Sequence, residues 1–347
     1  MFERSREDIV MRVGIAALVL AMAVGNAAAQ DKPVELKFSH WVPATHPIVK
    51  ASEQWADSIK KASNGTINIT IYPAQQLGKA FDHYDMARDG IADIAYANPG
   101  YTPGRFPVIA AGELPFLLAN GKEGSAALDA WYRKYAPKEM SEVKFCLAFV
   151  HDPGTFHSTR KKIVVPSDVA GMKIRPAGAT VARFITMLGG ANVQASAVES
   201  RDILEKNVAD GITFPWGSIV LFGMDKVLKY HMDTALYTSV QTWVMNKAKY
   251  DAMSPAQKKV IDDHCTTEWA LKIASPWADF EAGGRDKIKA IPGQDVYQLT
   301  PEQLAQWRAA AEPLINEWAD PARKAGYDAK AVLDELKASA AKYNAAY

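Results

Sequence analysis

The sequence predicts an α/β protein with two lobes, each built on a mixed, mainly parallel sheet flanked by helices, with a cleft between the lobes. Two α/β blocks follow one another, at about residues 34–97 and 143–214, and the last hundred residues are mostly helical. A chain of 347 residues has room for two domains. We see no internal repeat and no long linker, so short crossings between the lobes suit a hinge.

The first block alternates strand and helix. Val34 to His40 alternates apolar and polar residues, and Thr66 to Tyr72 is rich in β-branched residues, so both are predicted strands. A helix begins at His46-Pro47, places Ile48, Trp55 and Ile59 on one face, and ends at Asn64-Gly65. This order calls for parallel pairing with helices on both faces of the sheet. The block continues with a helix over Leu77 to Arg88 and a strand over Ile91 to Ala97.

The second block begins with Val143 to Val150, which is apolar enough for a buried strand. Ser196-Ala197-Val198-Glu199 forms a capping box for a helix that runs to about Asn207. Ser254-Pro255 and Thr300-Pro301 start later helices with Pro at the first helical position. The other predicted elements are a turn over Pro166 to Gly171, strands over Met172 to Arg175 and Asn192 to Ala195, a helix over Ala179 to Leu188, and extended segments over Gly211 to Phe214 and Val240 to Met245.

Composition and motifs exclude several classes of function. Forty basic residues balance thirty-nine acidic ones, so no basic excess is available for a nucleic-acid backbone. The sequence contains no G-x-S-x-G, no G-x-x-x-x-G-K-[ST], no H-E-x-x-H, no C-x-x-C and no G-x-G-x-x-G. We therefore expect neither an enzyme nor a bound cofactor or metal.

The N-terminus predicts export. Arg12 precedes an apolar run from Val13 to Val24 that is too short to span a bilayer, and the small residues that follow end at Ala29. This is the layout of a signal peptide cleaved near Ala29, within residues 1–29. The first ten residues are acidic for such a segment, so Met11 is the cleaner start. The alternative is a buried core helix. With no cysteine near the cleavage site we expect no lipid anchor, and no later segment that spans a membrane.

Histidines and cysteines offer little chemistry. His40 and His46 flank a loop, where local hydrogen bonding is the commoner role and metal binding the alternative. Cys146 lies in an apolar predicted strand, so we expect it to be a buried hydrophobic residue. Cys265 lies on a predicted helix, and we expect it to have no catalytic role. A disulfide between these two is possible in an exported protein, and the sequence alone does not decide whether it forms.

Arg175 is the strongest candidate for binding. It ends a short strand just before Pro176, and ligands of open α/β sheets bind beyond the carboxyl ends of strands. An arginine there presents two parallel N–H donors to a carboxylate, although a structural ion pair is an equal alternative. Aromatic residues gather after other predicted strands, where they are either core or cleft wall. These are His40-Trp41, Phe156-His157 and Phe214-Pro215-Trp216, with Trp243 inside its strand.

Several longer segments together resemble one known family, the extracytoplasmic solute-binding subunits of tripartite ATP-independent periplasmic (TRAP) transporters, of the dicarboxylate-binding-protein-like type. The resemblance covers essentially the whole chain after residue 29. The segments are LKFSHWVPATHPI (36–48), IYPAQQLG (71–78), GIADIAYANPGYTPGRFP (90–107), ELPFL (113–117), DVAGMKIRPAG (168–178) and LGGANVQASAVESRDILEKNVADGITFPW (188–216).

The resemblance implies a two-lobed periplasmic binding protein that closes about a hinge, with helices between the lobes. It implies delivery of an organic acid to small and large TRAP membrane subunits driven by an ion gradient, by a periplasmic protein expected to be a monomer. The family's carboxylate-binding arginine falls on Arg175. We expect lobe I over residues 30–151 plus about 241–280, and lobe II over residues 152–240 plus about 281–347.

Two departures from the family pattern bear on the ligand. The loop where sugar-acid binders often carry a second arginine has Phe156-His157, and Phe214 replaces an asparagine common before the proline. Both changes favour an aromatic or apolar monocarboxylate, with a small C4-type dicarboxylate as the alternative. The predicted ligand-binding residues are Arg175, Phe214, Trp216, Phe156, His157, His40, Trp41, Gln76, Tyr96 and Trp243.

Other classes of function stay open at this stage. A binding protein of an ATP-driven importer would have a similar fold and a different membrane partner. An exported hydrolase or lyase would need an active site that the motif search misses. A sensor ectodomain would bind the same ligand and signal through a receptor.

Overall fold

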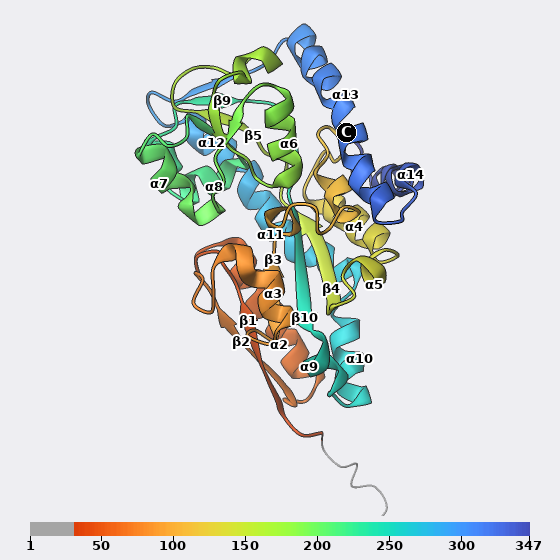
Figure 1. The fold of residues 1–347 in the computed structure, drawn as a ribbon. Helices are drawn as coiled ribbons and strands as arrows, with labels where there is room; N and C mark the ends of the chain where they lie inside the picture. The colour runs from red at the N-terminus through yellow and green to blue at the C-terminus, as the bar shows by residue number, and fades with distance from the viewer. Residues whose placement is uncertain (1–30) are drawn as a thin grey trace, which may run out of the picture. The chain divides into compact units, whose positions relative to one another are not determined.

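Two β-sheets, each flanked by helices, form the framework of the computed structural model, which describes residues 31–347 (Figure 1). The first sheet has five strands and the second has six. The predicted two-lobed α/β fold is confirmed. The predicted signal peptide, the start at Met11 and the cleavage near Ala29 lie outside the described residues.

The first sheet has the strand order β2-β1-β3-β10-β4. Strand β1 pairs in parallel with β2 and β3, whereas β10 runs antiparallel between β3 and β4. Because β10 follows all but one strand of the second sheet in the chain, the polypeptide returns through it to the first sheet. The strands are β1 (Val34–Ser39), β2 (Ile67–Tyr72), β3 (Ile94–Ala97), β4 (Val143–Val150) and β10 (Val240–Asn246).

The second sheet has the order β11-β9-β5-β8-β6-β7. Strand β6 pairs in parallel with β7 and β8, and β5 runs antiparallel to β8 and β9. Both sheets are therefore mixed. The strands are β5 (Thr155–Ser158), β6 (Lys173–Arg175), β7 (Ala191–Asn192), β8 (Gly211–Phe214), β9 (Tyr230–Met232) and β11 (Asp295–Tyr297).

Helices cover these sheets and also cross between them. The α-helices are α2 (Pro47–Ala62), α3 (His83–Arg88), α4 (Lys122–Tyr132), α5 (Ala136–Glu139), α6 (Ala179–Met187), α7 (Ser200–Glu205), α8 (Trp216–Leu221), α9 (Lys247–Asp251), α10 (Pro255–Asp263), α11 (Thr267–Ala282), α12 (Gly284–Lys289), α13 (Pro301–Lys324) and α14 (Ala329–Lys342). The short 3₁₀ turns are η1 (Ala80–Asp82), η2 (Pro99–Tyr101), η3 (Ile109–Glu113), η4 (Pro166–Val169), η5 (Ala197–Glu199) and η6 (Met224–Lys226).

Two sets of helices connect the sheets. Helix α11 packs against α2 and α4 beside the first sheet and against α8 and α12 beside the second. Helix α13 packs against α6, and α14, which follows it, packs against α4. The C-terminal helices thus touch elements of both sheets, and the lobe boundaries expected from the sequence stay a prediction.

Local sequence explains where the long helices start. His46 caps α2 by accepting a hydrogen bond from the Ile48 amide, and the predicted face of Ile48, Trp55 and Ile59 is buried. The capping box of Ser196 and Glu199 forms as predicted. Capping boxes at Ser254 and Thr300 also form, and α10 and α13 begin there, each with Pro at the first helical position.

Some predicted elements differ from the structure. The predicted helix over Leu77 to Arg88 is only a 3₁₀ turn and the short helix α3. The predicted helix to Asn207 ends at Glu205, and Phe156-His157 lie within a strand rather than beyond one. Strands β9 and β11 were not predicted. Each has three residues, too few for an alternating pattern to stand out from its surroundings.

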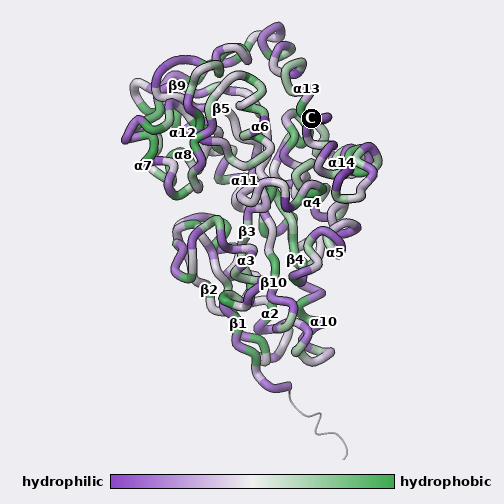
Figure 2. The backbone as a smooth tube through the Cα atoms, viewed as in Figure 1, coloured by the Kyte–Doolittle hydropathy of each residue, from purple (hydrophilic) through white to green (hydrophobic). Residues whose placement is uncertain are grey.

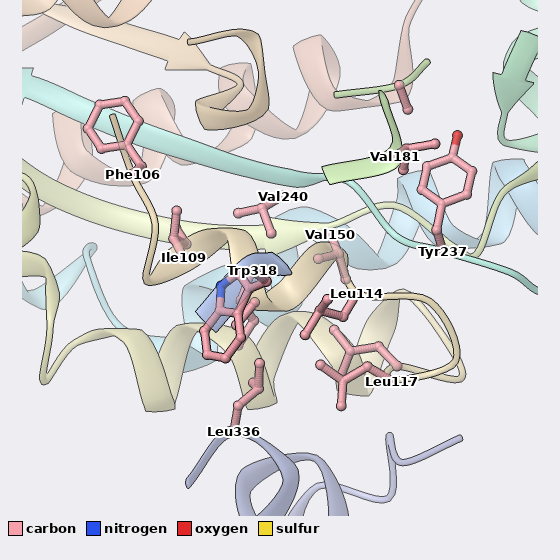
Figure 3. Close-up of a cluster of buried hydrophobic side chains, with 14 of the residues drawn as sticks. Phe106, Ile109, Leu114, Leu117, Val150, Val181, Tyr237, Val240, Trp318 and Leu336 are labelled. Carbon is pink, nitrogen blue, oxygen red and sulfur yellow. The ribbon is translucent and has the colours of Figure 1, made fainter. Parts of the chain in front are cut away.

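Two hydrophobic cores bind the sheets to their helices. In Figure 2 the hydrophobic colour dominates β4, whereas α13 alternates between the two colours, as expected of a half-exposed helix. One core joins Val150 and Val240 of the first sheet to Trp318 of α13 and Leu336 of α14 (Figure 3). The same core includes Ile174 of the second sheet, so it is continuous between the lobes.

Cys146 of β4 and Cys265, just before α11, form a disulfide that the sequence left open. Both residues are buried, and the bond ties the first sheet to the chain entering the long crossing helix. Among the described helices none is long and apolar enough to cross a membrane. Within residues 31–347 no group of three or more His, Cys, Asp or Glu side chains could hold a metal ion.

Candidate functional site

Arg175 stands at the carboxyl end of β6. Pro176, which lacks an amide hydrogen, ends the strand immediately after it. Arg175 is opposite Ile212 in the parallel register with β8, so Phe214, two residues farther on, lies on the same face of the sheet. The Arg175 guanidinium carbon accordingly lies 5.4 Å from the centroid of the Phe214 ring. Because β6 ends at Arg175 and pairs with β8 in this register, the guanidinium lies beyond the edge of the second sheet.

The Arg175 side chain is buried without a counter-charge. It is only 2% exposed, its Nε donates to the carbonyl of Ala195 over 2.9 Å, and its Nη2 donates to the hydroxyl of Tyr101 over 3.2 Å. It forms no ion pair with any residue between 31 and 347. Hydrogen bonds from Ser196, rather than Arg175, are the main reason that the pKa of the Glu199 carboxyl is lowered. A buried cation is costly unless an anion neutralises it, so Arg175 is poised to bind an anion.

A cavity adjoins Arg175 and lies between the two sheets. The space between its lining atoms is about 380 Å³, which includes the open solvent at its mouth. Six aromatic side chains line it, which makes most of its wall apolar. The lining residues are Trp41, His46, Asn98, Tyr101, His151, Arg175, Ala177, Ala197, Phe214, Pro215, Ser218, Phe222, Tyr237, Ser239, Gln241 and Trp277.

Arg175 is the one charged side chain among those lining residues. The cavity also contains two histidines, but burial lowers the pKa of His46 to about 3 and that of His151 to about 4. Both imidazoles are therefore neutral near pH 7. A ligand bound in this cavity meets a single positive charge surrounded by aromatic rings and neutral polar groups.

Tyr101 extends the cationic end of the cavity. It belongs to η2, after β3 of the first sheet, and its oxygen accepts hydrogen bonds from Arg175 Nη2 and from the amide of Ala197, 3.0 Å away. Because both of these groups are donors, the phenolic proton is left for another acceptor. Arg175 and Tyr101 together offer N–H and O–H donors from both sheets.

Three of the ten predicted site residues line the cavity, namely Arg175, Phe214 and Trp41. The indole of Trp41 stacks on Tyr96 with the ring centroids 5.1 Å apart. Tyr96 itself lies behind Trp41, fully buried, and Trp243 packs against Phe38 and Trp55 in the core.

Other predicted residues are engaged elsewhere. His40 Nε2 bonds the Ser52 hydroxyl over 3.0 Å, and Gln76 is exposed on a loop. Phe156 packs on Trp307 in the core. His157 is fully buried, with Nδ1 2.8 Å from Nδ1 of His231, and Trp216 packs edge-on against it. None of these side chains lines the cavity beside Arg175.

Sequence reasoning missed most of the wall. Tyr101 lies within the 90–107 segment that supported the resemblance, so it could have been found there. Gln241 shares a face of β10 with Trp243 and lies two residues closer to the start of the strand. Phe222, Tyr237 and Trp277 come from a helix end, a loop and a helix, and no local pattern marks them.

A larger hollow of about 1010 Å³ lies between α6, α13 and the loops that contain η2 and η3. Its arginine, Arg183, is already paired with Glu317, with Nε donating over 2.8 Å. It therefore lacks the unpaired buried cation that distinguishes the cavity at Arg175.

Comparison with known proteins gives a consistent family. The model of the family described as bacterial extracellular solute-binding protein, family 7, matches residues 38–321. Among curated proteins, the C4-dicarboxylate-binding periplasmic protein DctP of Rhodobacter capsulatus is 23% identical over 326 residues, which are 89% of this chain and 92% of that protein.

Solved structures of similar fold contain several kinds of acid: two relatives described next contain aromatic acids, whereas others, at 17–20% identity, contain glucuronate or pyroglutamate. A TRAP solute-binding protein from Rhodoferax ferrireducens T118, in complex with copurified benzoate, is 29% identical with a TM-score of 0.84, over 90% of this chain and 98% of that one. A marine metagenome TRAP solute-binding protein specific for aromatic acid ligands, with 3-hydroxybenzoate, is 32% identical with a TM-score of 0.84, over 90% of this chain and 99% of that one.

Proposed function

Because the chain belongs to family 7 of the bacterial extracellular solute-binding proteins, the TRAP solute-binding proteins, we propose that it captures an aromatic monocarboxylate in the cavity beside Arg175. Members of this family are periplasmic transport proteins rather than enzymes. We further propose that this chain passes its ligand to the small and large TRAP membrane subunits.

One observation carries the choice of ligand: a single, buried, unpaired arginine in an otherwise uncharged, aromatic-walled cavity. One cation neutralises one carboxylate. A charge-assisted hydrogen bond contributes about 1.5–3 kcal/mol, and a buried ring adds roughly 2–3 kcal/mol from its apolar area. Two such hydrogen bonds and the ring together contribute about 5–9 kcal/mol, a range that includes micromolar affinity, about −8 kcal/mol.

The single positive charge among the lining residues disfavours a C4-type dicarboxylate. A second carboxylate buried in this cavity would need a second cation, and the remaining candidates, His46 and His151, are neutral. The similarity to a dicarboxylate-binding relative at 23% identity keeps this class as the alternative to test. Aromatic acids bound to two relatives of 29% and 32% identity support the aromatic choice.

The two hydrogen-bond donors at the cationic end of the cavity come from different lobes, which supports capture of the ligand by closure of the lobes. Arg175 comes from the second sheet and Tyr101 from a turn beside the first. We propose that a carboxylate bound to both groups holds the lobes together and that the aromatic wall then excludes water from the ligand.

The test is a binding screen of the purified protein by calorimetry, with benzoate, phenylacetate, succinate, malate and glucuronate as probes. We expect benzoate or phenylacetate to bind in the micromolar range and succinate and malate far more weakly. Tight binding of only the dicarboxylates would replace the proposed ligand class. Binding of none of the acids would contradict the proposed function.

Arg175→Met tests the clamp in the same assay. Loss of the partner of a buried carboxylate costs about 2–5 kcal/mol, so binding should fall beyond detection. Because an unpaired buried charge is removed, the ligand-free variant should unfold at the same or a higher temperature than the wild type. Arg201→Met, at an exposed arginine paired with Glu205, is the matched control. Unchanged affinity in Arg175→Met would show that the clamp is elsewhere.

A further inference from the structure

The cavity wall contains an amide that the fold leaves unpaired. Gln241 of β10 is 2% exposed and lines the cavity, yet its Oε1 has no hydrogen-bond partner among the described residues. Nearly all buried polar atoms in proteins are hydrogen-bonded, and an unpaired one marks a place where a ligand group is expected.

A second unpaired atom belongs to Trp41, which also lines the cavity. Trp41 is 5% exposed, and its Nε1 has no partner in the part of the chain that the structure describes. Its ring lies 6.0 Å from the ring of Tyr101, which bonds Arg175. We therefore assign the Trp41 donor to the carboxylate end of the ligand, together with Arg175 and Tyr101.

Gln241 has a polar neighbour in the cavity wall, Ser239. Ser239 immediately precedes β10 and lines the same cavity as Gln241. The backbone amide of Ser239 is held by Nε2 of His151, over 3.0 Å, which fixes the start of this segment. A polar spot of Ser239 and Gln241 thus interrupts the aromatic wall.

The chemistry of this spot selects a neutral group that both donates and accepts. A primary amide offers one acceptor and two donors and can turn end for end. A ligand hydroxyl can donate to Oε1 and accept from an amide or serine donor, whereas an unsubstituted aromatic ring satisfies neither. A second carboxylate could not donate to Oε1, and it would be buried without a cation.

We infer that the ligand is a hydroxylated aromatic acid whose carboxylate binds at Arg175 and whose hydroxyl is recognised by Gln241. This inference rests on the proposed function. Gln241 then determines specificity among aromatic acids, whereas Arg175 determines that an acid binds at all. The two roles are separable by experiment.

The test compares affinities of matched acids by calorimetry: benzoate against 2-, 3- and 4-hydroxybenzoate, and phenylacetate against mandelate and the ring-hydroxylated phenylacetates. In the wild type at least one hydroxylated acid should bind about tenfold more tightly than its parent. In Gln241→Leu that ratio should fall to about one. Gln306→Leu, at an exposed glutamine of α13, is the control and should keep the wild-type ratio.

The outcomes separate this inference from the proposed function. If aromatic acids bind but no hydroxyl improves affinity, or if the ratio is the same in Gln241→Leu, the role of Gln241 is wrong and the proposed function stands. If no aromatic acid binds to the wild type, both fail. Should Gln241→Leu fold poorly by circular dichroism, Gln241→Glu replaces it: the carboxylate has no donor when ionised, and the preferred hydroxyl position should change or be lost.

Discussion

The hydroxyl of Tyr101 lies 3.2 Å from Nη2 of Arg175 and connects the turn after β3 to the end of β6. The same oxygen accepts from the Ala197 amide, so the O–H bond itself is directed to a further acceptor. The two residues that would grip a carboxylate are thus hydrogen-bonded to each other across the two sheets.

Tyr101→Phe should weaken binding of a carboxylate without unfolding the protein. The variant loses one hydrogen bond to the anion and the contact that orients Arg175. A hydrogen bond to a charged group contributes about 1.5–3 kcal/mol, so we expect roughly a tenfold to hundredfold increase in Kd. Tyr84→Phe, at a buried tyrosine outside the cavity, should bind as the wild type does. Equal affinities in both variants would remove Tyr101 from the site.

The buried carboxyl of Glu113 should make the free energy of unfolding depend on pH. Its carboxyl is buried behind the site loops: a Cβ added at Gly100 or Gly178 would lie 2.9 Å from Oε1 or 3.2 Å from Oε2. Burial raises the pKa of Glu113 to about 7, against a hydrogen bond from the Val240 amide that lowers it. The native state therefore holds this proton more tightly than the unfolded chain does. Its stabilising contribution is full below about pH 4.5 and is lost as the pH rises to about 7.

Glu113→Gln should remove this dependence. The free energy of unfolding of the variant, relative to wild type, should rise by up to about 3 kcal/mol between pH 4.5 and 7.5. Urea titrations at several pH values measure it, with Glu123→Gln at an exposed position as control. A difference that stays constant with pH would show that Glu113 does not titrate in this range.

Much of the site follows from local sequence, and the rest depends on long-range register. Pro176 and the short strand before it indicate where Arg175 stands, and the parallel pairing places Phe214 beneath it. No local signal tells which strand-end aromatic faces the cavity. Trp243, which pairs with Tyr96 of β3, packs into the core, whereas Gln241, on the same face of β10, lies beyond the residues that pair with β3 and lines the cavity.

Partners from distant strands also escape prediction. His157 was expected in the cleft, but β5 pairs with β9 and brings His231 within 2.8 Å of it. Strand β9 is three residues long, and neither its presence nor its register could be derived from the pattern of residues 230–232. Predicting the fold class required only the order of helices and strands with clear sequence patterns. Predicting the site required these strand pairings as well.

Glu281 predicts that ligand affinity falls between pH 6 and pH 8. Its carboxylate accepts from the Ser218 amide over 2.8 Å and from the Trp277 indole over 2.7 Å, and both residues line the cavity. Burial raises the pKa of Glu281 to about 7, against these hydrogen bonds. When it ionises, it repels a bound carboxylate by about 1 kcal/mol, or roughly fivefold in Kd. His46 and His151 are neutral throughout this range and add nothing.

Glu281→Gln should flatten that pH profile and bind at pH 8 about as tightly as the wild type binds at pH 6. Glu113→Gln, measured beside it, reports how much of the slope comes from the other carboxyl with a pKa near 7. A profile that is equally steep in Glu281→Gln would exclude Glu281 as its source.

The disulfide between Cys146 and Cys265 should stabilise the fold without contributing to binding. It joins residues 119 positions apart, and neither cysteine lines the cavity. Closing so long a loop restricts the unfolded chain, and native disulfides typically contribute about 2–4 kcal/mol. The double variant Cys146→Ala/Cys265→Ala should lose that much free energy of unfolding in urea and keep the wild-type Kd for whichever acid the screen identifies. Reduced wild type should match the double variant in stability. An unchanged free energy of unfolding would show that the bond adds nothing, and a changed Kd would show that β4 and the start of α11 help to shape the site.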